Sequence, residues 1–82
     1  PVATEVDSNG NIYVADRATG KVHRKATDGT ITVIAELSLG LDNVWLSDDE
    51  SNLYVSGNNN DLWRIRISNN NIRVLISADV SN

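Results

Sequence analysis

The chain contains no cysteine and no methionine. Disulfide bonds, thiolate metal ligands and thioether chemistry are therefore excluded. It has one histidine, His23, and no motif that seats a serine on a strained turn beside it. Because nucleophilic catalysis needs a nucleophile and a base in contact, we expect no catalytic residue. We expect His23 to lie exposed on a strand.

Positive charge is also scarce. Seven Lys and Arg residues stand against eleven Asp and Glu residues, which gives a formal net charge of −4. A protein that binds a phosphate backbone needs a basic surface, so nucleic acid is not an expected partner. Apolar runs long enough to span a membrane, about 18 residues, are missing. The sequence therefore predicts a soluble protein without a membrane span, and it leaves the compartment open.

The residues that are abundant favour strands. The chain holds nine Val and seven Ile, and its apolar residues show no helical period. Asn9-Gly10 and Asp28-Gly29 separate short apolar runs, and these dipeptides favour tight hairpins with positive φ at both central residues. We predict an all-β chain with strands at residues 3–6, 11–16, 21–27 and 31–36.

Comparison of the chain with itself indicates two copies of this unit. A shift of 41 residues gives six identities, all on the predicted strands and turns: Asp7/Asp48, Asn11/Asn52, Tyr13/Tyr54, Val14/Val55, Ile31/Ile72 and Val33/Val74. The second copy then has strands at residues 43–47, 52–57, 61–68 and 72–77. A four-stranded antiparallel unit of about 40 residues has the period of a β-propeller blade. We therefore predict one blade at residues 1–41 and a second at residues 42–82.

Two segments resemble known propeller families. The segment VDSNGNIYVAD at residues 6–16 resembles the NHL-repeat signature, in which an aspartate, a Gly-Asn turn and an apolar-Tyr-Val-Ala-Asp strand recur. The segment LSDDESNLYV at residues 46–55 is similar to the matching stretch of the gluconolactonase and strictosidine-synthase-like propellers. The resemblance implies a six-bladed ring.

Two blades cannot close a ring, because a propeller needs about four to eight blades and an unpaired end exposes apolar surface. Either the chain assembles or it is part of something larger. Two, three or four copies would give four, six or eight blades, and the resemblance favours three. We expect a homotrimer with a head-to-tail interface.

Alternate connections of a blade emerge on the same side. The connections at residues 16–20, 37–42 and 57–60 are expected on one side, and the hairpins around residues 9–10, 28–29 and 69–70 on the other. Amide and carboxylate groups pair with sugar hydroxyls, and an indole stacks on sugar C–H faces. We therefore expect multivalent, lectin-like carbohydrate binding on the first side, through Asp16, Arg17, Asn58, Asn59, Asp61 and Trp63.

The two tryptophans each have a second interpretation. Trp63 occupies the apolar position held by Val22 in the first copy, so it is also a candidate core residue. Trp45 stands opposite Thr4 or Glu5, depending on a one-residue slip between the copies. Facing the channel, Trp45 is a ligand platform; facing a blade, it is core.

The residues alone predict no cofactor. The gluconolactonase-like families hold a divalent cation through carboxylate and asparagine oxygens, so the resemblance implies Asp42 or Asn43 as a ligand for Ca²⁺ or another divalent cation. The alternative, purely structural interpretation is that Asp42-Asn43 ends a linker. Three functions follow: a non-catalytic carbohydrate-binding module, a metal-dependent lactonase or related hydrolase, and a scaffold or propeller fragment without a small-molecule site.

Overall fold

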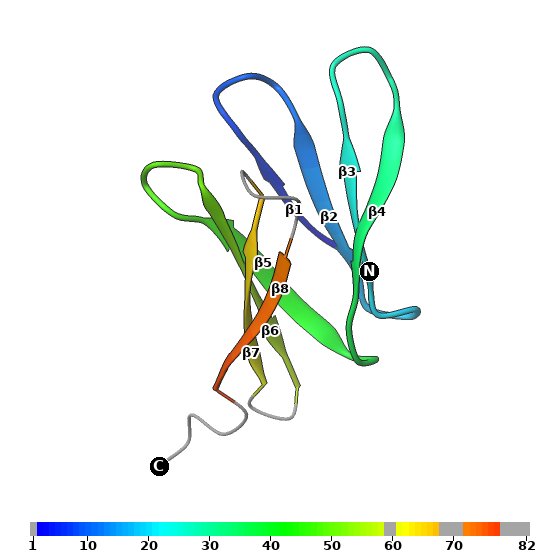
Figure 1. Ribbon diagram of the computed structural model, residues 1–82. Coiled ribbons are helices and arrows are strands. Elements are labelled where there is room, and N and C mark those ends of the chain that lie inside the picture. The colour runs from blue at the N-terminus through cyan, green and yellow to red at the C-terminus, as the bar shows by residue number, and fades with distance from the viewer. Residues whose placement is uncertain (1, 59–60, 68–71, 78–82) are drawn as a thin grey trace.

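The computed structural model describes residues 2–58, 61–67 and 72–77, which form eight strands and no helix (Figure 1). The strands are β1 (Val2–Val6), β2 (Ile12–Asp16), β3 (Lys21–Lys25), β4 (Ile31–Glu36), β5 (Leu41–Leu46), β6 (Asn52–Gly57), β7 (Leu62–Arg66) and β8 (Ile72–Ser77). They form two antiparallel sheets, which we call sheet 1 (β1-β2-β3-β4) and sheet 2 (β5-β6-β7-β8). The predicted all-β character is confirmed.

The core lies between the two sheets, where β5 packs against β1 and β2 (Figure 1). Alternate residues along each strand point to opposite faces of a sheet, so a single face of each sheet supplies the core. Its buried residues are Tyr13, Ala15, Val22, Ile34 and Ala35 from sheet 1 and Leu41, Val44, Leu53, Val55, Trp63 and Ile65 from sheet 2. Each fully buried aliphatic side chain contributes roughly 1.5–3 kcal/mol, so this face-to-face contact stabilises the pair of sheets.

The two sheets share one register irregularity. In sheet 1 the pairing of β3 with β4 shifts between Val22 and His23, and in sheet 2 the pairing of β7 with β8 shifts between Leu62 and Trp63. The extra residue of a bulge changes which side chains face inward, and in sheet 1 both Ile34 and the adjacent Ala35 are buried. Trp63 thus corresponds to His23 rather than to Val22.

The hairpin turns differ from the predicted two-residue type. The N–H of Gly10 donates to the carbonyl of Asp7 (3.1 Å), and the N–H of Asp7 donates to the carbonyl of Asn11 (3.0 Å). Only the glycine of Asn9-Gly10 has a positive φ, at 89°. Both dipeptides mark antiparallel hairpin turns, as predicted, but only the glycine of each adopts the positive φ that both residues tolerate, at 93° for Gly29.

The matching turn of sheet 2 places Glu50 at φ 61° where sheet 1 has Gly10. It also contains an additional residue before Asn52, because Ser47 rather than Asp48 receives the turn's hydrogen bond from Glu50. The shift between the copies is therefore 40 residues for β1 and β5 and 41 for β2 and β6, and it returns to 40 for β3 and β7. The hairpin predicted around residues 69–70 lies outside the described residues.

Polar side chains join the two sheets near these turns. The carboxylate of Glu50 accepts hydrogen bonds from the N–H and the hydroxyl of Ser8, at 3.0 and 2.7 Å. The Glu5 carboxylate accepts a hydrogen bond from the N–H of Leu46 at 3.1 Å. These contacts fix the position of β5 against β1.

Asp7 organises the first hairpin. Its carboxylate accepts hydrogen bonds from the N–H groups of Asn9 and Asn11 (both 2.9 Å), the Asn11 amide (3.0 Å) and the Tyr13 hydroxyl (3.2 Å). Burial raises the pKa of Asp7, but these hydrogen bonds outweigh it and hold the pKa below its usual value of 3.8. The folded chain thus binds this proton more weakly than the unfolded chain does.

We expect Asp7→Ala to lower the free energy of unfolding by about 2 kcal/mol, the typical contribution of hydrogen bonds to a charged group. Because the folded pKa is the lower one, the carboxylate stabilises fully above pH 3.8, and this contribution is lost as pH falls below that value. Urea titrations at pH 7 and pH 3 measure the effect. The variant should lose less stability between the two pH values than the unaltered chain, and equal losses would contradict the assignment.

Candidate functional site

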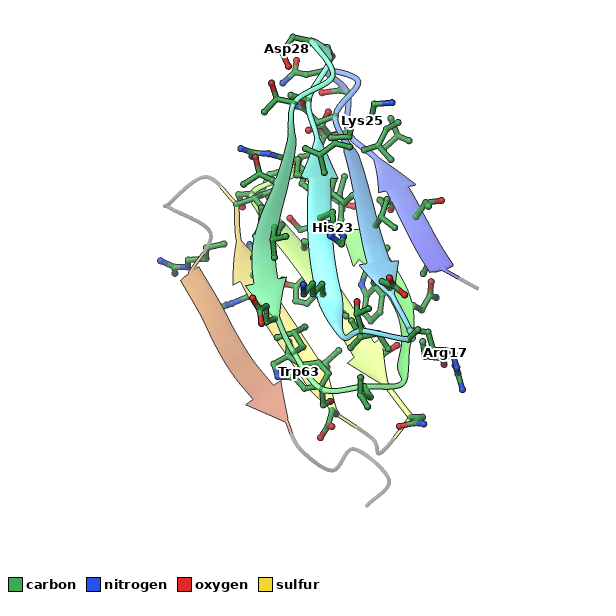
Figure 2. The ribbon with its side chains drawn as sticks, turned by 90° about the vertical axis from the view of Figure 1, so that its right-hand side faces the viewer. Arg17, His23, Lys25, Asp28 and Trp63 are labelled. Atoms are coloured by element: carbon green, nitrogen blue, oxygen red, sulfur yellow. The ribbon has the colours of Figure 1, made fainter. Side chains whose placement is uncertain are left out.

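Three connections meet at one end of the molecule, which we call the loop end. They are the β2–β3 loop, the linker between the sheets and the start of the β6–β7 loop, and they lie opposite the hairpin turns (Figure 1). Figure 2 shows Arg17 at this end and Asp28 at the other. The predicted grouping of these connections on one side is what the structure shows.

Backbone hydrogen bonds hold the three connections together. The N–H of Leu37 donates to the Gly20 carbonyl (2.7 Å), and the N–H of Gly40 donates to the Arg17 carbonyl (3.0 Å). The N–H of Asn58 in turn donates to the Gly40 carbonyl (3.1 Å). The linker is thus bonded to a loop of each sheet, and this arrangement places polar side chains from both sheets next to one another.

Arg17, Asp42 and Asn58 are the polar side chains gathered there. A guanidinium nitrogen of Arg17 lies 3.7 Å from a carboxylate oxygen of Asp42, and both side chains are exposed. Asp42 is the extra residue where the β5–β6 pairing shifts between Leu41 and Asn43. The Asn58 amide lies against Gly40, where an added Cβ would come within 2.6 Å of its nitrogen. A glycine with φ 83° is therefore required for the amide to approach the linker.

Asp16 and Asp61 flank the same connections, but their described hydrogen bonds are local ones. One carboxylate oxygen of Asp16 accepts a hydrogen bond from the N–H of Ala18 (3.0 Å), and the backbone carbonyl of Asp61 accepts one from Gly57 (2.9 Å). Asn59 lies outside the described residues. Trp63 is 8% exposed and packs in the core, behind sheet 1 in Figure 2, which favours its core interpretation.

Trp45 lies away from the loop-end polar group. Its strand register puts it on the face of sheet 2 that points away from sheet 1, where it is 39% exposed. Its ring stacks on that of Tyr54, with centroids 5.7 Å apart and planes 21° from parallel. Tyr54 was not among the predicted site residues, although the shared Tyr-Val strand motif and the alternation along β6 indicate that it lies beside Trp45.

The two predicted metal ligands are engaged by other groups. Asp42 faces the positive charge of Arg17, and the side-chain oxygen of Asn43 accepts a hydrogen bond from the N–H of Val44 (2.9 Å). Within residues 2–58, 61–67 and 72–77, no three His, Cys, Asp or Glu side chains gather as a metal site would require.

A second feature lies on the face of sheet 1 that points away from sheet 2. His23 is half-buried there rather than exposed, at the middle of β3, and Lys25 lies farther along the strand toward the hairpin end (Figure 2). These two residues and Ile12, Val14 and Ile31 line a hollow of about 320 Å³. Its exposed lining is almost entirely apolar, so His23 belongs to a hydrophobic surface.

Comparisons with known proteins add no assignment: the chain matches no family model, and no curated protein or solved structure is significantly similar to it. The resemblance to NHL-repeat and gluconolactonase-like propellers thus rests on the two segments at residues 6–16 and 46–55. Nor does the described part of the chain contain a helix that could cross a membrane.

Proposed function

We propose that the chain is a non-catalytic binding module whose two sheets act as neighbouring blades of a β-propeller. Further copies of the chain complete the ring, three copies giving six blades. Support comes from the four-strand meander of each sheet, their face-to-face packing and the shared bulge position. The rotation from one sheet to the next is the relation that repeats around such a ring.

The ligand is a carbohydrate bound at the loop end. The observation that carries this proposal is the hydrogen-bonded junction of three connections, which brings Arg17, Asp42 and Asn58 together at the surface. A guanidinium, a carboxylate and an amide offer the donors and acceptors that neighbouring sugar hydroxyls need. An exposed ion pair contributes little to stability, so hydroxyl groups can replace part of it at small cost. Each copy in a ring repeats the site, which raises avidity without new contacts.

The arrangement at Asp42 does not support the metal-dependent lactonase. A cation bound there would have to compete with the Arg17 guanidinium for the same carboxylate. The Asn43 oxygen would also have to leave the backbone N–H of Val44. Neither group is prepared for a cation, whereas both loop-end charges are accessible to a neutral polar ligand.

A glycan array, followed by titration of the strongest binder, tests the proposal. We expect Asp42→Asn to weaken binding about tenfold, because a hydrogen bond to a charged group contributes about 1.5–3 kcal/mol. The matched control is Asp48→Asn, which removes the same charge from the hairpin end and should bind as the unaltered chain does. A blank array, or equal binding by the two variants, would remove the carbohydrate site and leave a scaffold.

A further inference from the structure

Corresponding residues of the two sheets lie on corresponding faces. In sheet 1 the strand register places Tyr13 between Glu5 and Arg24, and this face packs against sheet 2. In sheet 2 the register places Tyr54 between Trp45 and Arg64. That face points away from sheet 1, and we call Trp45, Tyr54 and Arg64 the aromatic face.

The opposite faces correspond in the same way. Sheet 2 packs against sheet 1 through a face that includes Leu46, Leu53, Val55 and Trp63. The corresponding face of sheet 1 points away from sheet 2. We call this the aliphatic face, and its residues are Val6, Ile12, Val14, His23, Lys25 and Ile31.

We propose that the aromatic face of one copy packs on the aliphatic face of a second copy of this chain. The contact is head-to-tail and repeats the packing of sheet 1 on sheet 2. This inference rests on the ring in the proposed function and specifies its interface. It follows that each interface, within a copy and between copies, contains one Trp, one Tyr and one Arg: Trp63, Tyr13 and Arg24 within a copy, and Trp45, Tyr54 and Arg64 between copies.

The contact between Glu5 and Leu46 within the chain identifies the pair of residues expected to be in contact between copies. Within the chain, the Glu5 carboxylate reaches the backbone of Leu46. The corresponding pair between copies is Trp45 and Val6, which stand at the matching register positions. A polar contact is thus replaced by two apolar side chains, and Val6 is 58% exposed on a face that also carries the apolar hollow. No element of the described chain covers the exposed parts of Trp45 and Val6. In the proposed contact, Trp45 of one copy covers Val6 of the next.

The aromatic and aliphatic faces also differ in complementary ways from the two faces that pack together within the chain. The aliphatic face has His23 where sheet 2 has Trp63, and the 320 Å³ hollow lies at that position. The aromatic face has Trp45 where sheet 1 has Glu5, so it projects an additional indole. The aliphatic face is therefore hollowed, and the aromatic face carries an additional bulky side chain. Arg64, on the aromatic face, carries a buried Nε without a hydrogen-bond partner among the described residues.

Two charged variants test the orientation of the contact. Val6→Glu blocks only the aliphatic face, and Trp45→Glu blocks only the aromatic face. The matched control is Leu39→Glu, which places the same charge on a 65% exposed apolar residue of the linker, away from both faces. Circular dichroism verifies that each variant retains its strands, and analytical ultracentrifugation gives its mass.

We expect each face variant alone to sediment as an 8.9 kDa monomer and Leu39→Glu to assemble as the unaltered chain does. An equal mixture of the two face variants should form a one-to-one dimer and nothing larger, since one intact face of each remains. Assembly of Trp45→Glu alone would show a contact between two aliphatic faces and overturn the head-to-tail arrangement. Assembly of both variants alone, or a monomeric mixture, would also overturn it.

The carbohydrate site and the interface fail separately. A monomeric unaltered chain that still binds a glycan through Asp42 overturns the interface and leaves the loop-end site intact. A head-to-tail assembly with a blank glycan array overturns the carbohydrate site and leaves the interface intact.

Discussion

Trp63→Ala should lower the free energy of unfolding by about 3–5 kcal/mol, the usual cost of emptying a buried aromatic position. Trp63 belongs to the core between the sheets. Its ring also packs against Gly57, where an added Cβ would lie 3.2 Å from a ring carbon. A small domain is stable by only about 5–15 kcal/mol, so this loss removes much of its stability. Urea denaturation followed by circular dichroism measures it.

Trp45→Ala provides the matched control, because it deletes the same side chain from an outward face. At a protein concentration that keeps both variants monomeric, it should cost about 0.5–1.5 kcal/mol, the range for one pair of stacked aromatic rings. Similar losses for the two variants would mean that Trp63 does not hold the sheets together.

The second large effect is expected at Gly20. It has φ 76°, and a Cβ there would lie 2.8 Å from the carbonyl oxygens of both Leu37 and Ser38. Gly20→Ala therefore combines the left-handed backbone penalty of about 1–2 kcal/mol with the roughly 1–3 kcal/mol cost of a forced backbone shift. It also disturbs the hydrogen bond from Leu37 that closes the loop end.

Gly29→Ala separates these two costs. Gly29 has φ 93° and no atom within 4 Å of an added Cβ, so the variant should lose only the backbone penalty. Thermal denaturation of the two variants side by side is the measurement. If Gly29→Ala destabilises the chain as much as Gly20→Ala does, the close approach of the linker to the β2–β3 loop is not what requires glycine at position 20.

Much of the strand pattern could be predicted from the sequence, because short runs rich in β-branched residues are separated by turn dipeptides and recur in the second copy. The predicted strand at residues 21–27 is longer than β3, since Ala26 already belongs to a turn in which its N–H donates to the Thr30 carbonyl. Turn type could not be predicted from Asn-Gly and Asp-Gly alone. The Asp7 carboxylate bonds to the backbone of the same turn, which favours a wider turn with one left-handed residue.

The faces of the sheets were harder to predict than the strands. A shift of one residue moves a side chain to the other face, and the two copies differ by an insertion before Asn52. The connection between β6 and β7 is in turn one residue shorter than that between β2 and β3. A single shift of 41 residues therefore matched Trp63 with Val22, whereas the strand register matches it with His23. The Arg17–Asp42 pair was also beyond the sequence, because a bulge at Asp42 sets which way its carboxylate points.

The solution mass of the unaltered 82-residue chain tests most directly whether the aromatic face of one copy packs on the aliphatic face of the next. Sedimentation equilibrium at micromolar concentration should give about 27 kDa, which is three times 8.9 kDa, for a closed ring of three copies. A folded chain that stays at 8.9 kDa throughout the concentration series would show that neither face needs a partner.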